Sequence, residues 1–483
     1  MLDLSVRGAV VVTPRGRCQA DIHVAGGTIV ALGSLDAAAR ETVDAGGLLA
    51  LPGVVDSHVH FMDPGDPARE DFITGSAAAA VGGATTVIEH THGAPVRDAQ
   101  ELRRKVDHLR RRSLVDYGLA AHVWPDRLRA LREVWEAGAA YLKVFTCETH
   151  GVPAVLAGDL LQCLRDVARW DGIVLAHCED DAITREREAA LRRAGRTDYG
   201  VVPEWRSREA EAVAAAEVAL LARLTGARVV VAHTSHPAVV ELVGRERDRG
   251  ARIWVESCPQ YFYLREDEVL EHGPLRKFTP PARLRSAGDA VEMWRLLRAG
   301  AITHMSTDHA PSTREQKRAG DIWTCHFGLP GVETTLALLL HAAHEGHLTV
   351  ERVVDVLCEW PARLYGFYPR KGALAPGADA DIVLVEPEAR RVLTDGQVVS
   401  RAGWTPYAGM EVVGRPTMTF CRGRLVARDG RPQGEPGWGR WLPGAGAASG
   451  RPATSPGEDA PRRARGGAGG RAPAAGASAP STG

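Results

Sequence analysis

The sequence predicts an α/β protein centred on a (β/α)8 TIM barrel, and three observations carry this prediction. Short apolar strands alternate with amphipathic segments through most of the 483 residues, which is typical of repeated βα units. Eight strand candidates can be counted in this region, the number that closes such a barrel. Glycine-punctuated strands precede and follow it, so we expect the two ends of the chain to pair into one β-rich domain beside the barrel.

Residues 1–52 are predicted to form the N-terminal part of that flanking domain. Three apolar runs with alternating character lie at 4–12, 20–24 and 28–32, separated by glycines. Their length and punctuation are those of short β-strands rather than of helices.

Residues 53–370 carry the regular alternation expected of the barrel. The predicted strands are 54–59, 85–89, 117–123, 140–145, 173–177, 228–233, 252–256 and 302–307. Helical periodicity marks several segments between them, namely 126–136, 157–169, 208–224 and 238–249. We expect these helices to form an outer ring around the strands.

The remaining chain divides into a second β-rich part and a tail. After a helical stretch at 350–357, strands are predicted at 372–376, 382–385 and 418–426, so residues 371–435 complete the flanking domain. Residues 436–483 are rich in Gly, Ala, Pro and Arg. Such a segment has too little apolar surface to offset the entropy of ordering, so we expect a disordered tail.

Composition excludes several classes of partner. Lys plus Arg (59) nearly balance Asp plus Glu (60), so no overall field attracts nucleic acid or an anionic membrane. No apolar run approaches the ~20 residues that span a bilayer. The eight cysteines form no C-x-x-C pair, and the N-terminus lacks a signal-like pattern, which favours reduced thiols in a cytoplasm.

Titratable side chains gather at the C-terminal ends of the predicted strands. The residues are His58, His60, Lys143, His177, His233 and Asp308. Taken singly, each has an ordinary explanation: a hydrogen-bonded histidine, a snorkelling lysine, or an aspartate that caps the next segment. Together they favour a functional site, because barrels of this kind build their sites at that face.

The motifs around these residues resemble those of the cyclic amidohydrolases, a group of hydantoinases (dihydropyrimidinases), allantoinases and dihydroorotases. The resemblance extends over about residues 4–426. It rests on Leu51-Pro52-Gly53-Val54-Val55-Asp56-Ser57-His58-Val59-His60, Gly82-Gly83-Ala84-Thr85-Thr86, Lys143-Val144-Phe145, His233-Thr234-Ser235, Thr307-Asp308-His309-Ala310-Pro311, Gly328-Leu329-Pro330-Gly331-Val332-Glu333-Thr334 and Gly377-Ala378-Asp379-Ala380-Asp381. It implies a TIM barrel with a small β-sandwich built from both termini, and a homodimer or homotetramer.

The resemblance also implies two divalent metal ions. His58, His60 and Asp308 would hold one, His177 and His233 the second, and Lys143 would bridge them as an N-carboxylate formed with carbon dioxide. Zinc is the expected metal, although manganese, cobalt and iron suit comparable ligands. Asp308 would be the catalytic residue, taking a proton from the attacking water and passing it to the departing ring nitrogen.

The implied reaction is hydrolysis of a cyclic amide to a ring-opened ureido or carbamoyl acid. Met62 stands where dihydroorotases carry a carboxylate-binding arginine, so we expect an uncharged ring such as a hydantoin, allantoin or dihydropyrimidine. The alternatives are a dihydroorotase in which Arg69 or Arg283 reaches the substrate, a non-catalytic assembly homologue, and a mononuclear deaminase, which would not need Lys143. Candidate substrate contacts are Glu148, Thr279, Phe327 and His92, and His90 and His150 are candidate pocket residues by position.

Overall fold

Parallel strands form the centre of the molecule. The computed structural model describes residues 1–448 and has an α/β fold. Two sheets, ordered β10-β9-β8 and β11-β12-β13-β14-β15-β16, contain only parallel pairings. Their strands are β8 (Val54–Val59), β9 (Ala84–Glu89), β10 (Asp116–Leu119), β11 (Ala121–His122), β12 (Leu142–Phe145), β13 (Ile173–His177), β14 (Arg228–Val231), β15 (Ile253–Ser257) and β16 (His304–Met305).

Hydrogen bonds link these two sheets at both ends. The amide of Ala120 donates to the carbonyl of Glu89 at the end of β9 (3.0 Å), and the next residue, Ala121, donates to Tyr141 before β12 (3.0 Å). At the other end, Val59 of β8 forms a parallel bridge with His309, which follows β16. The carboxyl ends of the parallel strands therefore share one rim.

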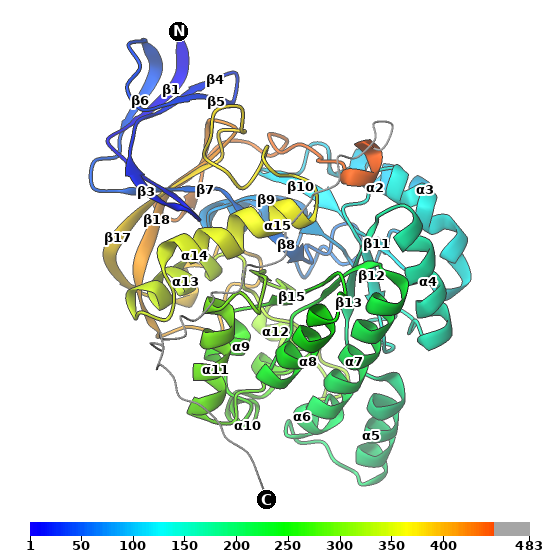
Figure 1. Cartoon of the computed structure of the whole chain (residues 1–483). Coiled ribbons are helices and arrows are strands. Elements are labelled where there is room, and N and C mark those ends of the chain that lie inside the picture. Colours follow the sequence, from blue (N-terminus) through cyan, green and yellow to red (C-terminus); the bar gives the residue numbers. More distant parts are fainter. Residues whose placement is uncertain (449–483) are drawn as a thin grey trace, which may run out of the picture. The chain divides into compact units, whose positions relative to one another are not determined.

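Helices lie outside the parallel strands, as Figure 1 shows for α4, α7 and α8. They are α1 (Phe72–Val81), α2 (Ala99–Leu109), α3 (Leu131–Glu136), α4 (Ala157–Arg169), α5 (Asp181–Arg193), α6 (Val201–Trp205), α7 (Arg208–Thr225), α8 (Pro237–Asp248), α9 (Gln260–Tyr263), α10 (Glu268–His272), α11 (Ala287–Arg298), α12 (Arg314–Arg318), α13 (Thr335–His344), α14 (Val350–Val354) and α15 (Trp360–Leu364). Shorter turns are the 3₁₀ helices at Pro125–Ala130, Gly273–Arg276, Asp395–Gln397 and Ala445–Ala448, and a π-helical turn at Asp355–Glu359.

Helix α7 illustrates how the sequence sets these boundaries. The Ser207 side chain accepts a hydrogen bond from the amide of Ala210, which caps the N-terminus. Gly226 ends the helix in the left-handed conformation, with φ of 73°. Between them, Ala214 and Val218 are buried one turn apart, so the helix buries a single face.

Two further sheets flank the parallel strands, and one of them joins both ends of the chain. It is ordered β20-β19-β18-β17-β7-β2-β3, and β7 pairs antiparallel with β17. Its strands are β2 (Val10–Thr13), β3 (Gly16–Gln19), β7 (Leu49–Pro52), β17 (Ile382–Val392), β18 (Glu411–Cys421), β19 (Arg424–Arg428) and β20 (Arg431–Pro432). In Figure 1 the blue N-terminal strands and the orange β17 and β18 lie together.

The other flanking sheet contains N-terminal strands alone. It is ordered β5-β4-β1-β6, with β1 (Leu2–Arg7), β4 (Ile22–Ala25), β5 (Thr28–Leu32) and β6 (Ala39–Asp44). One apolar cluster joins residues of both flanking sheets, such as Val6 of β1, Val11 of β2 and Leu384 of β17. The expected pairing of the two chain ends is therefore present.

All eight predicted barrel strands correspond to observed strands, and two of them differ most from their predicted ranges. The strand predicted at 117–123 is divided into β10 and β11 because the chain changes its hydrogen-bonding partner at Ala120. The strand predicted at 302–307 is reduced to the two residues of β16.

Three terminal predictions need larger corrections. The single strand predicted at 418–426 is divided, because β18 ends at Cys421 and β19 begins at Arg424. The single strand predicted at 4–12 is two strands, because Gly8 turns the chain with φ of 74°. No strand forms at 372–376, where Gly372 also has φ of 74° and lies against the carbonyl of Cys358.

The predicted disordered tail begins too early. Residues 436–448 are packed: Leu442 is buried, its amide donates to the carbonyl of Tyr117 (2.7 Å), and the amide of Gly444 donates to Gly138 (2.9 Å). The apolar side chains of Trp438, Trp441 and Leu442 pack against the protein core and hold this Gly-rich stretch in place. The rest of the predicted tail, 449–483, lies outside the described residues.

Within residues 1–448, no helix combines the length and apolarity that a membrane crossing requires.

Candidate active site

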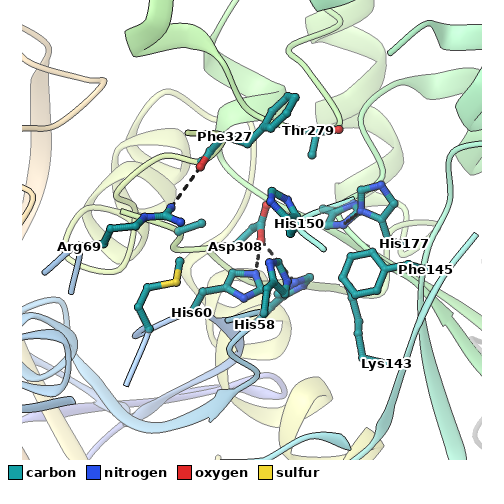
Figure 2. A pocket seen from close by; sticks show the side chains of 15 residues that line it. His58, His60, Arg69, Lys143, Phe145, His150, His177, Thr279, Asp308 and Phe327 are labelled. Carbon is teal, nitrogen blue, oxygen red and sulfur yellow. Dashed lines mark hydrogen bonds and ion pairs between the residues drawn. The ribbon is translucent and has the colours of Figure 1, made fainter. Parts of the chain in front are cut away.

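Six side chains predicted from the strand ends line one cavity at the shared rim. They are His58, His60, Lys143, His177, His233 and Asp308. Figure 2 shows His58, His60 and Asp308 close together, with Lys143 and His177 beside Phe145. The other residues that line the cavity are Met62, Arg69, His92, Phe145, His150, Thr279, Ala310, Phe327 and Gly328.

His58 and His60 present the same ring nitrogen to Asp308. Their Nε2 atoms lie 3.3 and 3.0 Å from Oδ1 of Asp308. Their Nδ1 atoms are held from behind, at 2.7 Å from Glu256 Oε1 and 2.6 Å from the carbonyl oxygen of His90. Partners of this kind orient metal-binding histidines in proteins. Burial alone would raise the pKa of the Asp308 carboxyl, but the two imidazoles hold it below its usual value.

His177 and His233 form a second pair across the cavity. Nδ1 of His177 lies 3.0 Å from Nε2 of His233, and Nε2 of His177 lies 2.8 Å from Glu179 Oε2. Burial opposes ionisation of Glu179, but the Arg206 guanidinium and His177 outweigh it and lower the pKa of that carboxyl to about 2. The resulting carboxylate orients His177 as Glu256 orients His58.

Lys143 lines the same cavity and lacks the partners that a buried lysine usually has. The side chain is 1 % exposed, and its Nζ atom has no hydrogen-bond partner among the described residues. The Nζ atom lies 5.0 Å from the ring centroid of Phe145. Burial lowers the pKa of the Lys143 amine to about 8. A buried ammonium without a partner is unfavourable, whereas a carboxylated lysine is an anion that could bind cations here.

The donor set therefore fits metal ions. Four imidazoles with one carboxylate are typical ligands of borderline divalent cations such as zinc.

The backbone around the cavity is strained. Among the seven described non-glycine residues with positive φ, four line the cavity: Met62, His150, His233 and Asp308. Such conformations persist where a site requires them.

Comparison with known proteins identifies the family. A model described as the amidohydrolase family matches residues 49–426. The chain belongs to that family. Its relatives place this amidohydrolase within the cyclic amidohydrolase group of hydrolases, as the sequence motifs predicted, and members of the family generally bind metal ions.

Three relatives illustrate the similarity. A solved structure titled L-hydantoinase (dihydropyrimidinase) from Arthrobacter aurescens is 33% identical, with a TM-score of 0.88, covering 92% of this chain and 100% of its own. An allantoinase from Rubrobacter xylanophilus is 35% identical over 89% of this chain and 95% of its own length. A dihydroorotase from Halobacterium salinarum is 36% identical over 87% and 96%.

The predicted substrate contacts of this amidohydrolase divide into two groups. His92, Thr279 and Phe327 line the cavity, as does the position-based candidate His150. Glu148 does not: its side chain is 60% exposed and pairs with Arg185 (2.8 Å). The structure therefore gives no support to a substrate contact at Glu148, whose side chain faces solvent after the buried Cys147.

His90 also differs from its predicted position. It does not line the cavity but packs behind it, with its ring centroid 4.6 Å from that of His58 and 4.3 Å from that of His60.

An arginine reaches the cavity of the amidohydrolase after all. Arg69 donates from Nε to the carbonyl oxygen of Pro311 (3.0 Å) and the hydroxyl of Ser312 (2.8 Å), and from Nη2 to the carbonyl oxygen of Phe327 (3.3 Å). Burial lowers the pKa of Arg69 to about 10. Arg283, the other candidate, is fully buried and does not line the cavity. The position of Arg69 therefore agrees with the alternative in which this arginine reaches the substrate, and the position of Arg283 does not.

The sequence reasoning missed the two carboxylates behind the histidines. Glu256 and Glu179 are both fully buried. Their positions in the sequence could have identified them: Glu256 ends the seventh predicted strand, and Glu179 lies two residues after His177, which ends the fifth.

Proposed function

We propose that this amidohydrolase hydrolyses a carbon–nitrogen bond in an uncharged cyclic amide, such as a hydantoin, allantoin or dihydropyrimidine ring. The product is a ring-opened ureido or carbamoyl acid. The convergence of His58, His60, Lys143, His177, His233 and Asp308 on one cavity carries the proposal. The hydantoinase and allantoinase names of the relatives support the same substrate class.

The proposal includes two divalent cations, with zinc favoured. His58, His60 and Asp308 would hold one, His177 and His233 the other, and Lys143 would bridge them after carboxylation. Bound there, the cations supply an acidified water and polarise a carbonyl group. The Nζ atom of Lys143 supports this assignment, because it is buried and no described residue forms a hydrogen bond with it.

Asp308 performs the proton transfer in this proposal. Its carboxyl has a lowered pKa, so it is ionised at neutral pH and can accept a proton. It takes that proton from the attacking water and returns it to the ring nitrogen as the carbon–nitrogen bond breaks. Its Oδ1 atom is held by both His58 and His60, which fixes the carboxylate in place.

The fold completes the proposal. Strands β8 to β16 with their helices would form a closed (β/α)8 barrel over residues 53–370. Residues 1–52 and 371–435 would form a composite β-sandwich. The links at Ala120 and between Val59 and His309 support closure, and the pairing of β7 with β17 supports the composite domain.

Arg69 favours a second candidate, the hydrolysis of a ring that carries a carboxylate, as in dihydroorotate. None of the three hydrogen-bond acceptors of Arg69 is a carboxylate. A cation on the cavity wall could bind an anionic substituent. A dihydroorotase among the relatives is consistent with this reading.

A hydrolysis screen separates the two candidates. The zinc-loaded enzyme is tested against hydantoin, dihydrouracil, allantoin and dihydroorotate, with kcat/KM measured for each. The proposal predicts the largest value for one of the three neutral rings. A larger value for dihydroorotate would establish the second candidate, and activity on none of the four would contradict both.

A further inference from the structure

Three histidines gather beside the cavity at the ends of neighbouring strands. His90 follows β9, His92 lies two residues further, and His122 ends β11. Each offers a ring nitrogen, and the three nitrogens all lie within 4.8 Å of one another. The ring centroids are 5.6 to 6.0 Å apart. The three side chains therefore converge on one point.

These imidazoles lack the partners that buried histidines normally have. His90 and His122 are 0% and 1% exposed. Five ring nitrogens have no hydrogen-bond partner among the described residues: both of His90, both of His122, and Nε2 of His92. Buried polar atoms without partners are rare and unfavourable in folded proteins. A ligand that accepts nitrogen lone pairs would satisfy all three rings at once.

We propose that His90, His92 and His122 bind a third transition-metal ion, of the zinc class, beside the two-metal centre. Three neutral imidazoles are a common ligand set for zinc, which then takes a fourth ligand from solvent. A hollow lined by His92, His150 and Trp124 opens next to the trio and can supply that water.

The trio is separate from the ligands assigned to the two-metal centre. His122 does not line the active-site cavity. His58 and His60 also lie near His90. Their Nδ1 atoms, however, are bonded to Glu256 and to the backbone carbonyl of His90, and their Nε2 atoms lie 3.3 and 3.0 Å from Asp308. The ring of His90 is thus left for His92 and His122.

Nearby charges do not occupy the site. Glu89, which ends β9, forms an ion pair with Lys105 (2.5 Å) and a short hydrogen bond with Thr91. The carboxylate and the ammonium are thereby paired with each other, and the trio itself is composed of imidazoles alone.

Metal stoichiometry tests the inference directly. The protein is saturated with zinc, freed of excess by gel filtration, and analysed for zinc per chain. Wild type is expected to hold three equivalents, whereas His122→Gln and His92→Asn, altered on two different segments, each hold two. His272→Gln, which removes an exposed histidine on α10, is the matched control and retains three.

A crossed variant separates this site from the two-metal centre. Lys143→Ala is expected to lose one or both of the other ions and to keep the ion of the trio, which the further variant Lys143→Ala/His122→Gln then loses. Cobalt titration of the wild type gives a second measurement that needs no substitution, since a third equivalent should bind with tetrahedral visible absorption. Saturation of the wild type at two equivalents of both metals would overturn the inference and leave the proposed function intact.

Discussion

Nδ1 of His58 lies 2.7 Å from a carboxylate oxygen of Glu256, and both side chains are buried. The same carboxylate oxygen accepts the backbone amide of His233 (3.2 Å), so one residue supports a histidine from each proposed metal position. Burial raises the pKa of the Glu256 carboxyl, but His58 and His304 outweigh that effect and hold it well below its usual range. Glu256 is therefore a buried anion that directs Nε2 of His58 into the cavity.

Glu256→Gln should weaken metal binding without unfolding the protein. Removing the charge behind His58 lowers the basicity of its ring, and changes to such partners typically cost 10- to 100-fold in metal affinity or activity. Zinc dissociation constants from chelator competition provide the measurement. Glu271→Gln, an exposed substitution on α10, is the control. Equal affinities for the two variants would show that Glu256 has no part in orienting the ligands.

Asp308→Asn separates proton transfer from metal binding. The amide keeps the size of the side chain and a possible oxygen ligand, but it cannot accept the proton. Turnover should fall by roughly 100-fold or more, the order that general acid–base groups contribute, while at least one metal ion of the two-metal centre is retained. Parallel measurement of kcat and metal content decides the point, and turnover near that of wild type would exclude Asp308 as the proton carrier.

Arg69→Met tests what the guanidinium on the cavity wall does. Its hydrogen bonds go to loop oxygens at Pro311, Ser312 and Phe327, so the best neutral substrate should lose less than about tenfold in kcat/KM. Dihydroorotate should lose about 10- to 150-fold, since a hydrogen bond to a charged group contributes about 1.5–3 kcal/mol. Arg69→Lys, which keeps the charge, is the control. A loss confined to neutral rings would contradict this interpretation.

The site could be predicted from the sequence where it depends on strand periodicity. His58 lies in β8 and His60 directly follows that strand, while Lys143 lies within β12 and His177 ends β13. Their convergence at one rim follows from the parallel arrangement of these strands. Strand periodicity does not predict where loop side chains lie. Arg69 reaches the cavity through contacts with Pro311 that are distant in sequence.

Glu148 and the terminal segments show the same limit. Glu148 turns outward where its loop pairs with Arg185 on α5, and no local pattern marks that choice. Likewise, Leu442 docks on the chain near Tyr117 through tertiary contacts, which composition alone does not reveal.

Carboxylation of Lys143 should depend on pH. Only the neutral amine reacts with carbon dioxide, and with its pKa lowered to about 8 by burial roughly a tenth of the amine is neutral at pH 7. The rate at which zinc and a fixed concentration of dissolved carbon dioxide reactivate metal-free enzyme should therefore rise about tenfold from pH 7 to 9 and then level off. A rate that continues to climb beyond pH 10 would indicate an unshifted lysine.

The proposed bridging of the two metal ions by Lys143 is tested most directly with Lys143→Ala. The metal content and the turnover of this variant are measured with and without an added short-chain carboxylate. The substitution removes the amine and leaves a space in which a small carboxylate can bind and replace the lost carbamate as a metal ligand. We predict at most one of the two ions of the centre and no measurable turnover in the variant alone, with partial recovery of both upon addition of acetate or propionate. Two ions retained in that centre together with undiminished turnover, in the absence of any added carboxylate, would contradict the account.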